Sequence, residues 1–174
     1  MLLEFTLAVG WPQIVALLVG LQRLAELALS RHNGRRLLAE GAVEIGAGHY
    51  KAIVWLQVIW LLAIILFVSP FEPIRWPLLI LYLLLQLGRV WVIATLGRYW
   101  TTRLYHLPGR PLVKRGPYRW LKHPNYWVVV LEVFLLPLVF GAWWLACFFG
   151  LLQLWLILWR LRTEEPALAE RRTL

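Results

Sequence analysis

Hydrophobic residues of this chain fall in long blocks that are separated by polar stretches. Three of the blocks cover roughly residues 5–29, 50–68 and 74–96. Each has about the 20 residues that an α-helix needs to cross roughly 30 Å of hydrocarbon, at about 1.5 Å per residue. The pattern predicts a transmembrane helix in each block.

A fourth apolar block, 126–159, is too long for one crossing. Pro137 and Gly141 lie near its middle and predict a helical hairpin. Each arm has only about 15 to 18 residues, which predicts tilting or local thinning of the bilayer. The charged segment 160–174 predicts a final amphiphilic helix. We therefore expect a single-domain, all-α, polytopic membrane protein with about five transmembrane helices.

Composition and charge support this interpretation. Hydrophobic residues make up 61% of the 174 residues and charged residues 16%, whereas about a quarter of a soluble domain is charged. The net charge of +9 could suggest nucleic-acid binding. However, the basic residues lie between apolar segments, as in membrane proteins, so we expect no nucleic-acid partner.

The basic residues also predict an orientation. With five crossings, the N-terminus and the turns near residues 70–75 and 138–142 share one side of the membrane, with Arg75 as their only basic residue. The loops 30–49 and 97–125 and the tail share the other side, which by the positive-inside rule is cytoplasmic. This predicts a multi-pass membrane protein with its polar loops in the cytoplasm.

The long polar loop 97–125 is the strongest candidate for chemistry, because loops of this length in compact proteins are more often functional than idle. His123 precedes Pro124, and proline suits the first turn of a helix. The His123 side chain and the free amides of that helix terminus could therefore face one ligand. In the tail, Arg160 and Glu164 are four residues apart and share a helix face. The simpler alternative is that these are interface charges that contact lipid headgroups and pair with each other.

Other site motifs are missing from the sequence. It has no glycine-rich dinucleotide fingerprint after a strand, no Walker loop, no serine elbow and no zinc-ligand spacing. One ionisable residue, Glu132, lies within an apolar run, which makes it a functional candidate. The preferred interpretation is a structural ion pair with Arg89 or Arg23. Arg23 and Glu26, three residues apart, are expected to pair as well.

Two linked motifs resemble a known family. Gly116-Pro-Tyr118, followed by Lys122-His123-Pro-Asn-Tyr126, precedes Arg160 and the pair Glu164-Glu165. This combination resembles the isoprenylcysteine carboxyl methyltransferase family, whose members are membrane enzymes that use S-adenosylmethionine. The stretch from Leu96 through Thr102 to Leu107-Pro-Gly is similar to a bacterial branch of that family. The branch is encoded beside type III polyketide synthases and is thought to O-methylate long-chain alkylpyrones and alkylresorcinols.

The resemblance implies roles for individual residues. Arg160 matches the substrate arginine of the family, whose guanidinium could hold the acceptor oxygen beside the methyl group. The residues implied in binding S-adenosylmethionine are Arg110, Pro111, Leu112, Val113, Tyr118, His123, Pro124, Asn125, Tyr126 and Glu164. The sequence departs from the family pattern at Lys122, where arginine is usual, and at Val128, where many members have glycine. If that glycine makes room for the substrate, Val128 argues against an isoprenyl acceptor.

The predicted function is methyl transfer from S-adenosylmethionine to a carboxylate, enol or phenol oxygen of a lipidic substrate. A carboxylate or acidic enol is ionised at neutral pH, whereas a phenol, with a pKa near 10, needs a base or a strong positive field. The alternatives are methylation of a protein's isoprenylcysteine carboxylate, nicotinamide chemistry as in the longer membrane sterol reductases, and a non-enzymatic scaffold or small transporter.

Overall fold

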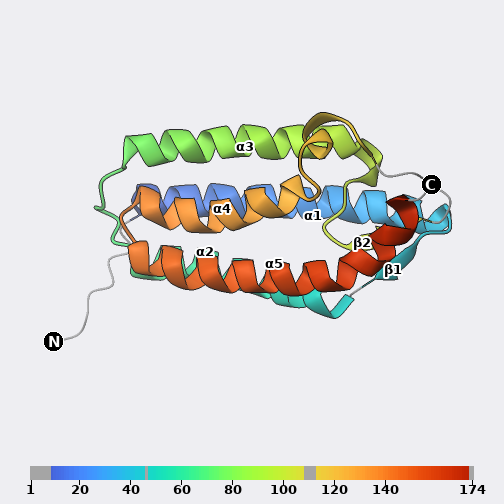
Figure 1. Ribbon diagram of the computed structural model, residues 1–174. Helices are drawn as coiled ribbons and strands as arrows, with labels where there is room; N and C mark the ends of the chain where they lie inside the picture. Colours follow the sequence, from blue (N-terminus) through green and yellow to red (C-terminus); the bar gives the residue numbers. More distant parts are fainter. Residues whose placement is uncertain (1–8, 46, 108–112, 173–174) are drawn as a thin grey trace.

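The computed structural model describes residues 9–45, 47–107 and 113–172, without the side chains of residues 47–49 and 163–172. Its helices are α1 (Trp11–Ala39), α2 (Ala47–Phe67), α3 (Trp76–Leu96), α4 (Pro124–Val139) and α5 (Trp143–Arg172). They run side by side in one bundle (Figure 1). Helices α1, α2, α3 and α5 are long and apolar enough to cross a membrane. The predicted all-α, polytopic membrane fold is confirmed.

The hairpin predicted near Pro137 and Gly141 is formed by α4 and α5. Helix α4 has 16 residues, which corresponds to about 24 Å, and the turn passes through Gly141 at a φ of 75°. Helix α5 continues to Arg172, so the second arm and the charged tail form one helix. Helix α1 likewise continues beyond the predicted membrane segment to Ala39, because arginine, leucine and alanine are good helix formers outside hydrocarbon as well.

The short turns meet at one end of the bundle. The backbone N–H of Arg75 donates to the carbonyl of Val139 at 2.9 Å, and a Cβ on Gly141 would lie 2.6 Å from the Arg75 guanidinium. At the start of α1, a Cβ on Gly10 would clash with the carbonyl oxygen of Pro70. These close approaches place the three segments on one side, as the charge pattern predicted.

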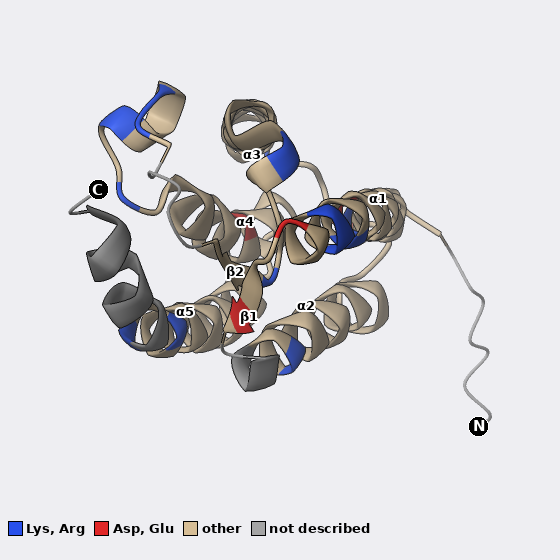
Figure 2. Ribbon diagram, turned by 90° about the vertical axis from the view of Figure 1, so that its right-hand side faces the viewer, with Lys and Arg blue, Asp and Glu red and all other residues tan. Residues whose placement is uncertain are grey.

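The polar loops meet at the opposite end, which Figure 2 shows end-on with its lysine and arginine residues. Strands β1 (Val43–Ile45) and β2 (Leu104–His106) pair antiparallel there, with Glu44 opposite Tyr105. Short 3-10 helices, η1 (Gly97–Tyr99) and η2 (Gly116–Arg119), lie in the same loop. The sequence did not predict this pairing, because three-residue strands carry no detectable period. It ties the long loop to the α1–α2 connection.

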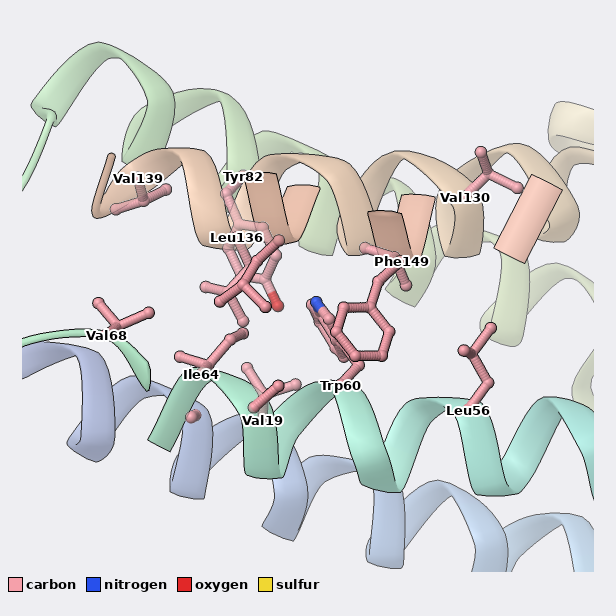
Figure 3. Close-up of a cluster of buried hydrophobic side chains, with 14 of the residues drawn as sticks. Val19, Leu56, Trp60, Ile64, Val68, Tyr82, Val130, Leu136, Val139 and Phe149 are labelled. Atoms are coloured by element: carbon pink, nitrogen blue, oxygen red, sulfur yellow. The ribbon is translucent and has the colours of Figure 1, made fainter. Parts of the chain in front are cut away.

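The apolar core lies between the helices rather than at either end. Trp60, Ile64 and Leu136 are fully buried, and Figure 3 shows them between α2 and α4. The outer faces carry exposed leucines, such as Leu84 and Leu151. Since lipid tails are as apolar as leucine, the bundle is held by close packing and polar contacts rather than by exclusion of water.

A cluster of four charged side chains links α1, α3 and α4 inside the bundle. Arg89 donates to Glu26 and Glu132, and Arg23 donates to Glu132, all at 2.6 Å; Arg23 also donates to Glu26 at 2.9 Å. The remaining Glu132 oxygen accepts from Gln86 at 2.7 Å. Glu132, predicted to pair with Arg89 or Arg23, pairs with both, and the predicted pair of Arg23 with Glu26 is also present. Two positive and two negative charges balance within the cluster, as burial in hydrocarbon requires.

Candidate functional site

A cavity of about 1540 Å³ lies at the basic end of the bundle and continues along α1 and α2. Its polar part is bordered by the start of α4 and by Arg160 of α5, and its apolar part by leucine, isoleucine and valine side chains of α1 and α2. The residues of the predicted site that line the cavity are Val113, Tyr118, His123, Asn125, Tyr126 and Arg160. Residues far apart in the sequence thus form one concave surface.

The start of α4 presents its polar residues to this cavity. Pro124 occupies the first turn of α4, as predicted, and His123 is its N-cap residue with a φ of −135°. Because His123 and Tyr126 are three residues apart, their rings come together and stack, with centroids 5.4 Å apart and planes within 9°. The side-chain oxygen of Asn125 is buried without a hydrogen-bond partner among the described residues. It is an acceptor available to a polar ligand.

Arg160 of α5 lies over the same aromatic surface. Its guanidinium carbon is 5.3 Å from the centre of the Tyr126 ring, a cation–π distance. Nη2 donates to the carbonyl of Thr102 at 2.9 Å. The side chain is only 7% exposed, and within the described chain its Nε has no acceptor. A buried guanidinium with a free donor favours an anionic oxygen beside it.

The loop that carries the Thr102 carbonyl is fixed by α1. Ser30 Oγ accepts the backbone N–H of Thr102 at 2.9 Å and lies 2.8 Å from its Oγ1. Asn33 Nδ2 donates to the carbonyl of Trp100 at 2.8 Å. From the sequence, Ser30 and Asn33 were assigned only to the loop 30–49. Their spacing of three is the sequence signal that could have placed them on one helix face, and in the structure both side chains are buried.

Helix η2 brings Tyr118 to the cavity wall. It begins at Gly116, whose φ is 56° and whose Cβ position would lie 2.6 Å from Thr95 Oγ1. Both conditions favour glycine. Pro117 is buried behind the turn, so Tyr118 and the preceding Val113 face inward and line the cavity.

An ion pair borders the cavity at its polar end. Arg103 donates to both carboxylate oxygens of Glu44, at 2.8 and 2.9 Å, and lies over the ring of Tyr50, 4.8 Å from its centre. The hydrogen bond to Glu44 raises the pKa of the Arg103 guanidinium. Burial raises the pKa of the neighbouring Tyr105 hydroxyl, so both groups keep their protons at neutral pH.

Some predicted residues cannot be placed in this way. Arg110, Pro111 and Leu112 lie outside the described residues. Glu164 lies in α5, one helical turn after Arg160, but its side chain is outside the described part of the chain. Val128, where many relatives have glycine, is 7% exposed and does not line the cavity. It does not narrow the cavity, so the argument from Val128 against an isoprenyl acceptor loses its support.

The apolar part of the cavity was not predicted from the sequence. It is lined by Leu17, Leu21 and Leu24 of α1 and by Val58 and Leu62 of α2. These side chains are also exposed at the bundle surface, from 40% for Val58 to 63% for Leu21 and Leu24. The cavity is therefore accessible along two helices that are long and apolar enough to cross a membrane.

Comparison with known proteins identifies the family. Residues 78–170 match the isoprenylcysteine carboxyl methyltransferase family. The chain belongs to this family. It is also 39% identical over 164 residues to the uncharacterized protein YpbQ of Bacillus subtilis (strain 168), across 92% of this chain and 96% of that protein. No solved structure matches it. The family match includes the polar part of the cavity from Tyr99 to Arg160, whereas α1 and α2, which form its apolar part, lie outside it.

Proposed function

We propose that this member of the methyltransferase family transfers a methyl group from S-adenosylmethionine to an oxygen of a lipidic acceptor. The observation that carries the proposal is the continuity of the cavity. Its polar end holds the aromatic, amide and guanidinium groups, and its other end is accessible along α1 and α2. Such a shape suits a polar cofactor and a lipid that enters from the side.

The residues at the polar end fit S-adenosylmethionine by their chemistry. Asn125 offers a buried acceptor, and the rings of Tyr118 and Tyr126 offer surfaces for adenine or for a sulfonium. We further propose that Glu164 accepts hydrogen bonds from hydroxyl or amino groups of the cofactor. When bound, the cofactor supplies a methyl group on a positively charged sulfur, and the acceptor oxygen bonds to that carbon as the carbon–sulfur bond breaks to leave a neutral thioether.

Arg160 is assigned the role of holding the acceptor oxygen. Its guanidinium is fixed by Tyr126 and the Thr102 carbonyl, so its remaining donor can stabilise negative charge without reorganising. Among the described cavity-lining side chains, the only carboxylate is Glu26, which is already paired with Arg23 and Arg89. The positive charge that Arg160 offers at the acceptor suits an oxygen that is ionised at neutral pH.

An acidic enol or a carboxylate fits this requirement better than a phenol does. Within the bacterial branch that the sequence resembles, this points to an alkylpyrone before an alkylresorcinol. The carboxylate of an isoprenylcysteine is the second candidate, and Val128 does not disfavour it, since it lies outside the cavity lining. In either case we place the polar end on the cytoplasmic side of a bacterial inner membrane, where S-adenosylmethionine is available.

Calorimetric titration of the purified protein with S-adenosylmethionine, or with its demethylated product, tests the cofactor. We expect binding by the wild type and none by His123→Ala, whose side chain lines the cavity. The matched control is His32→Ala, an exposed position on α1, which should bind like the wild type. Absence of binding by the wild type would leave a scaffold or transporter as the better hypothesis.

Transfer of labelled methyl groups tests the acceptor. Purified alkylpyrones, alkylresorcinols and an isoprenylcysteine compound are offered separately to the reconstituted enzyme. We expect the alkylpyrone to be labelled fastest. Faster labelling of the isoprenylcysteine compound would move the assignment to the other branch of the family.

A further inference from the structure

Residues 113–122, which we name the basic turn, carry a concentration of positive charge. Four cations in the turn are exposed: Lys114, Arg115, Arg119 and Lys122. Within the described chain none of them belongs to an ion pair. The sequence also has no acidic residue between Glu72 and Glu132. The charge of the turn is therefore not neutralised by carboxylates close to it in the sequence.

Exposed aromatic and apolar side chains flank these cations. Trp120 is 70% exposed and Leu121 is 46% exposed. The Trp120 ring packs edge-on against Trp91 of α3, with centroids 6.1 Å apart. Trp91 is itself 49% exposed, on a helix that can cross the membrane. Tryptophan is enriched at the depth of lipid headgroups, which favours a position of the basic turn near the lipid phosphates.

The other face of the basic turn belongs to the cavity. Val113 and Tyr118 line it, and so do Lys114, Arg115 and Lys122, whereas Arg119 lies outside the lining. Pro117 is buried. The turn is held to the end of α3 by the close approach of Gly116 to Thr95 and by a 3.3 Å bond from Arg115 to the Thr95 carbonyl. One short segment thus connects the membrane surface to the cavity wall.

We propose that the exposed cations of the basic turn, at the rim of the cavity, bind phosphate groups of anionic membrane lipids, and that this contact holds Tyr118 and Val113 against the cavity. In this arrangement Trp120 and Leu121 enter the membrane interface, and the cations contact the lipid phosphates. Each lysine or arginine near an anionic bilayer strengthens attachment about fivefold. The lipid contact is independent of the reaction, whereas its effect on ligand affinity rests on the proposed function.

Hydrogen exchange of the full chain in lipid nanodiscs tests the contact. One set of discs contains phosphatidylcholine alone and the other an equal mixture with phosphatidylglycerol. We expect the amides of residues 113–122 to exchange more slowly in the anionic discs, and those of β1 to exchange equally in both. In the Arg119→Gln protein, the slowing of exchange by anionic lipid should be about fivefold smaller. Arg35→Gln, an exposed arginine of α1 outside the cavity, should retain it.

Equal exchange of residues 113–122 in the two lipids would overturn the proposal. Equal protection by inorganic phosphate in neutral discs would overturn it too, because the site would then bind free phosphate. The effect of the lipid contact on ligand affinity, which we call the coupling, is tested by titrating the protein in both kinds of disc with S-adenosylhomocysteine. We expect tighter binding in the anionic discs, and equal binding in the two would refute the coupling. If neither disc binds it, the proposed function and the coupling both fail, while the exchange data still decide the lipid contact.

Discussion

Two buried arginines of this protein differ in how completely their donors are used. Arg89 is 4% exposed and all three of its guanidinium nitrogens donate to carboxylates, each at 2.6 Å. Arg160 is 7% exposed, yet it donates once to a carbonyl and has no ion pair among the described residues. The first lies midway along the bundle, and the second lies where α4 begins.

Among the described residues, Arg89 has carboxylate partners and Arg160 has none, and we propose that Arg89 is a structural charge and that Arg160 is available to a ligand. A buried ion pair is costly to break, because removing one partner leaves the other charge uncompensated. A buried guanidinium with a free donor is poised instead to bind an anion. Substitutions in the Arg89 cluster should therefore lower stability, and substitutions around Arg160 should lower turnover.

The largest effect is expected for Glu132→Leu. It removes the acceptor shared by Arg23 and Arg89, so the free energy of unfolding should fall by about 3 to 5 kcal/mol. Thermal unfolding in detergent measures it. Glu44→Leu, at the exposed pair with Arg103, is the matched control and should cost less than about 1 kcal/mol. If the Glu132→Leu protein is as stable as this control, the charged cluster does not contribute substantially to the stability of the helix bundle.

Arg160→Met should lower turnover rather than stability, the opposite of what is expected for Glu132→Leu. Turnover should fall by about two to three orders of magnitude, because a donor to the developing charge is lost. Thermal stability and the affinity for S-adenosylhomocysteine should stay close to wild type. Steady-state rates with the labelled methyl donor, together with calorimetry, separate these effects. Loss of stability with unchanged turnover would assign Arg160 to the same structural class as Arg89.

Gly116→Ala should disturb the cavity from the side of the basic turn. An alanine at a φ of 56° is strained by about 1 to 2 kcal/mol, and its Cβ would lie 2.6 Å from Thr95 Oγ1. Displacement of Tyr118 should weaken S-adenosylhomocysteine binding roughly tenfold. Gly88→Ala on α3, whose Cβ would meet open space, should bind normally. Equal affinities of the two variants would show that the turn does not position Tyr118.

The smallest effect is expected for Ser30→Ala. It removes the acceptor for the Thr102 backbone, a loss of about 1 kcal/mol, and should lower kcat several-fold with little change in KM. Ser30→Thr, which keeps a hydroxyl, should restore part of the rate. Ser69→Ala at the far end of the bundle should change neither constant. If the threonine variant is as slow as the alanine variant, Ser30 acts through packing rather than through its hydrogen bond.

Predictions from the sequence were most accurate where a local pattern carries the information. The four apolar blocks predicted the helices, and Pro137 with Gly141 predicted the turn between α4 and α5. His123-Pro124 predicted the start of α4. Helix ends were less accurate: α1 and α5 continue into their polar segments, because solvated basic residues continue a helix as readily as apolar ones do.

What the sequence determined by itself is the membrane-spanning bundle, the collection of charge at one end and the set of polar residues there. These follow from the length, period and order of side chains along the chain. Only the tertiary structure decided which charges are satisfied. Glu132 has two arginine partners on two other helices, and Arg160 depends on a carbonyl that Ser30 holds in place. Such contacts join residues 43 to 109 positions apart, and no local period encodes which faces of distant helices will meet.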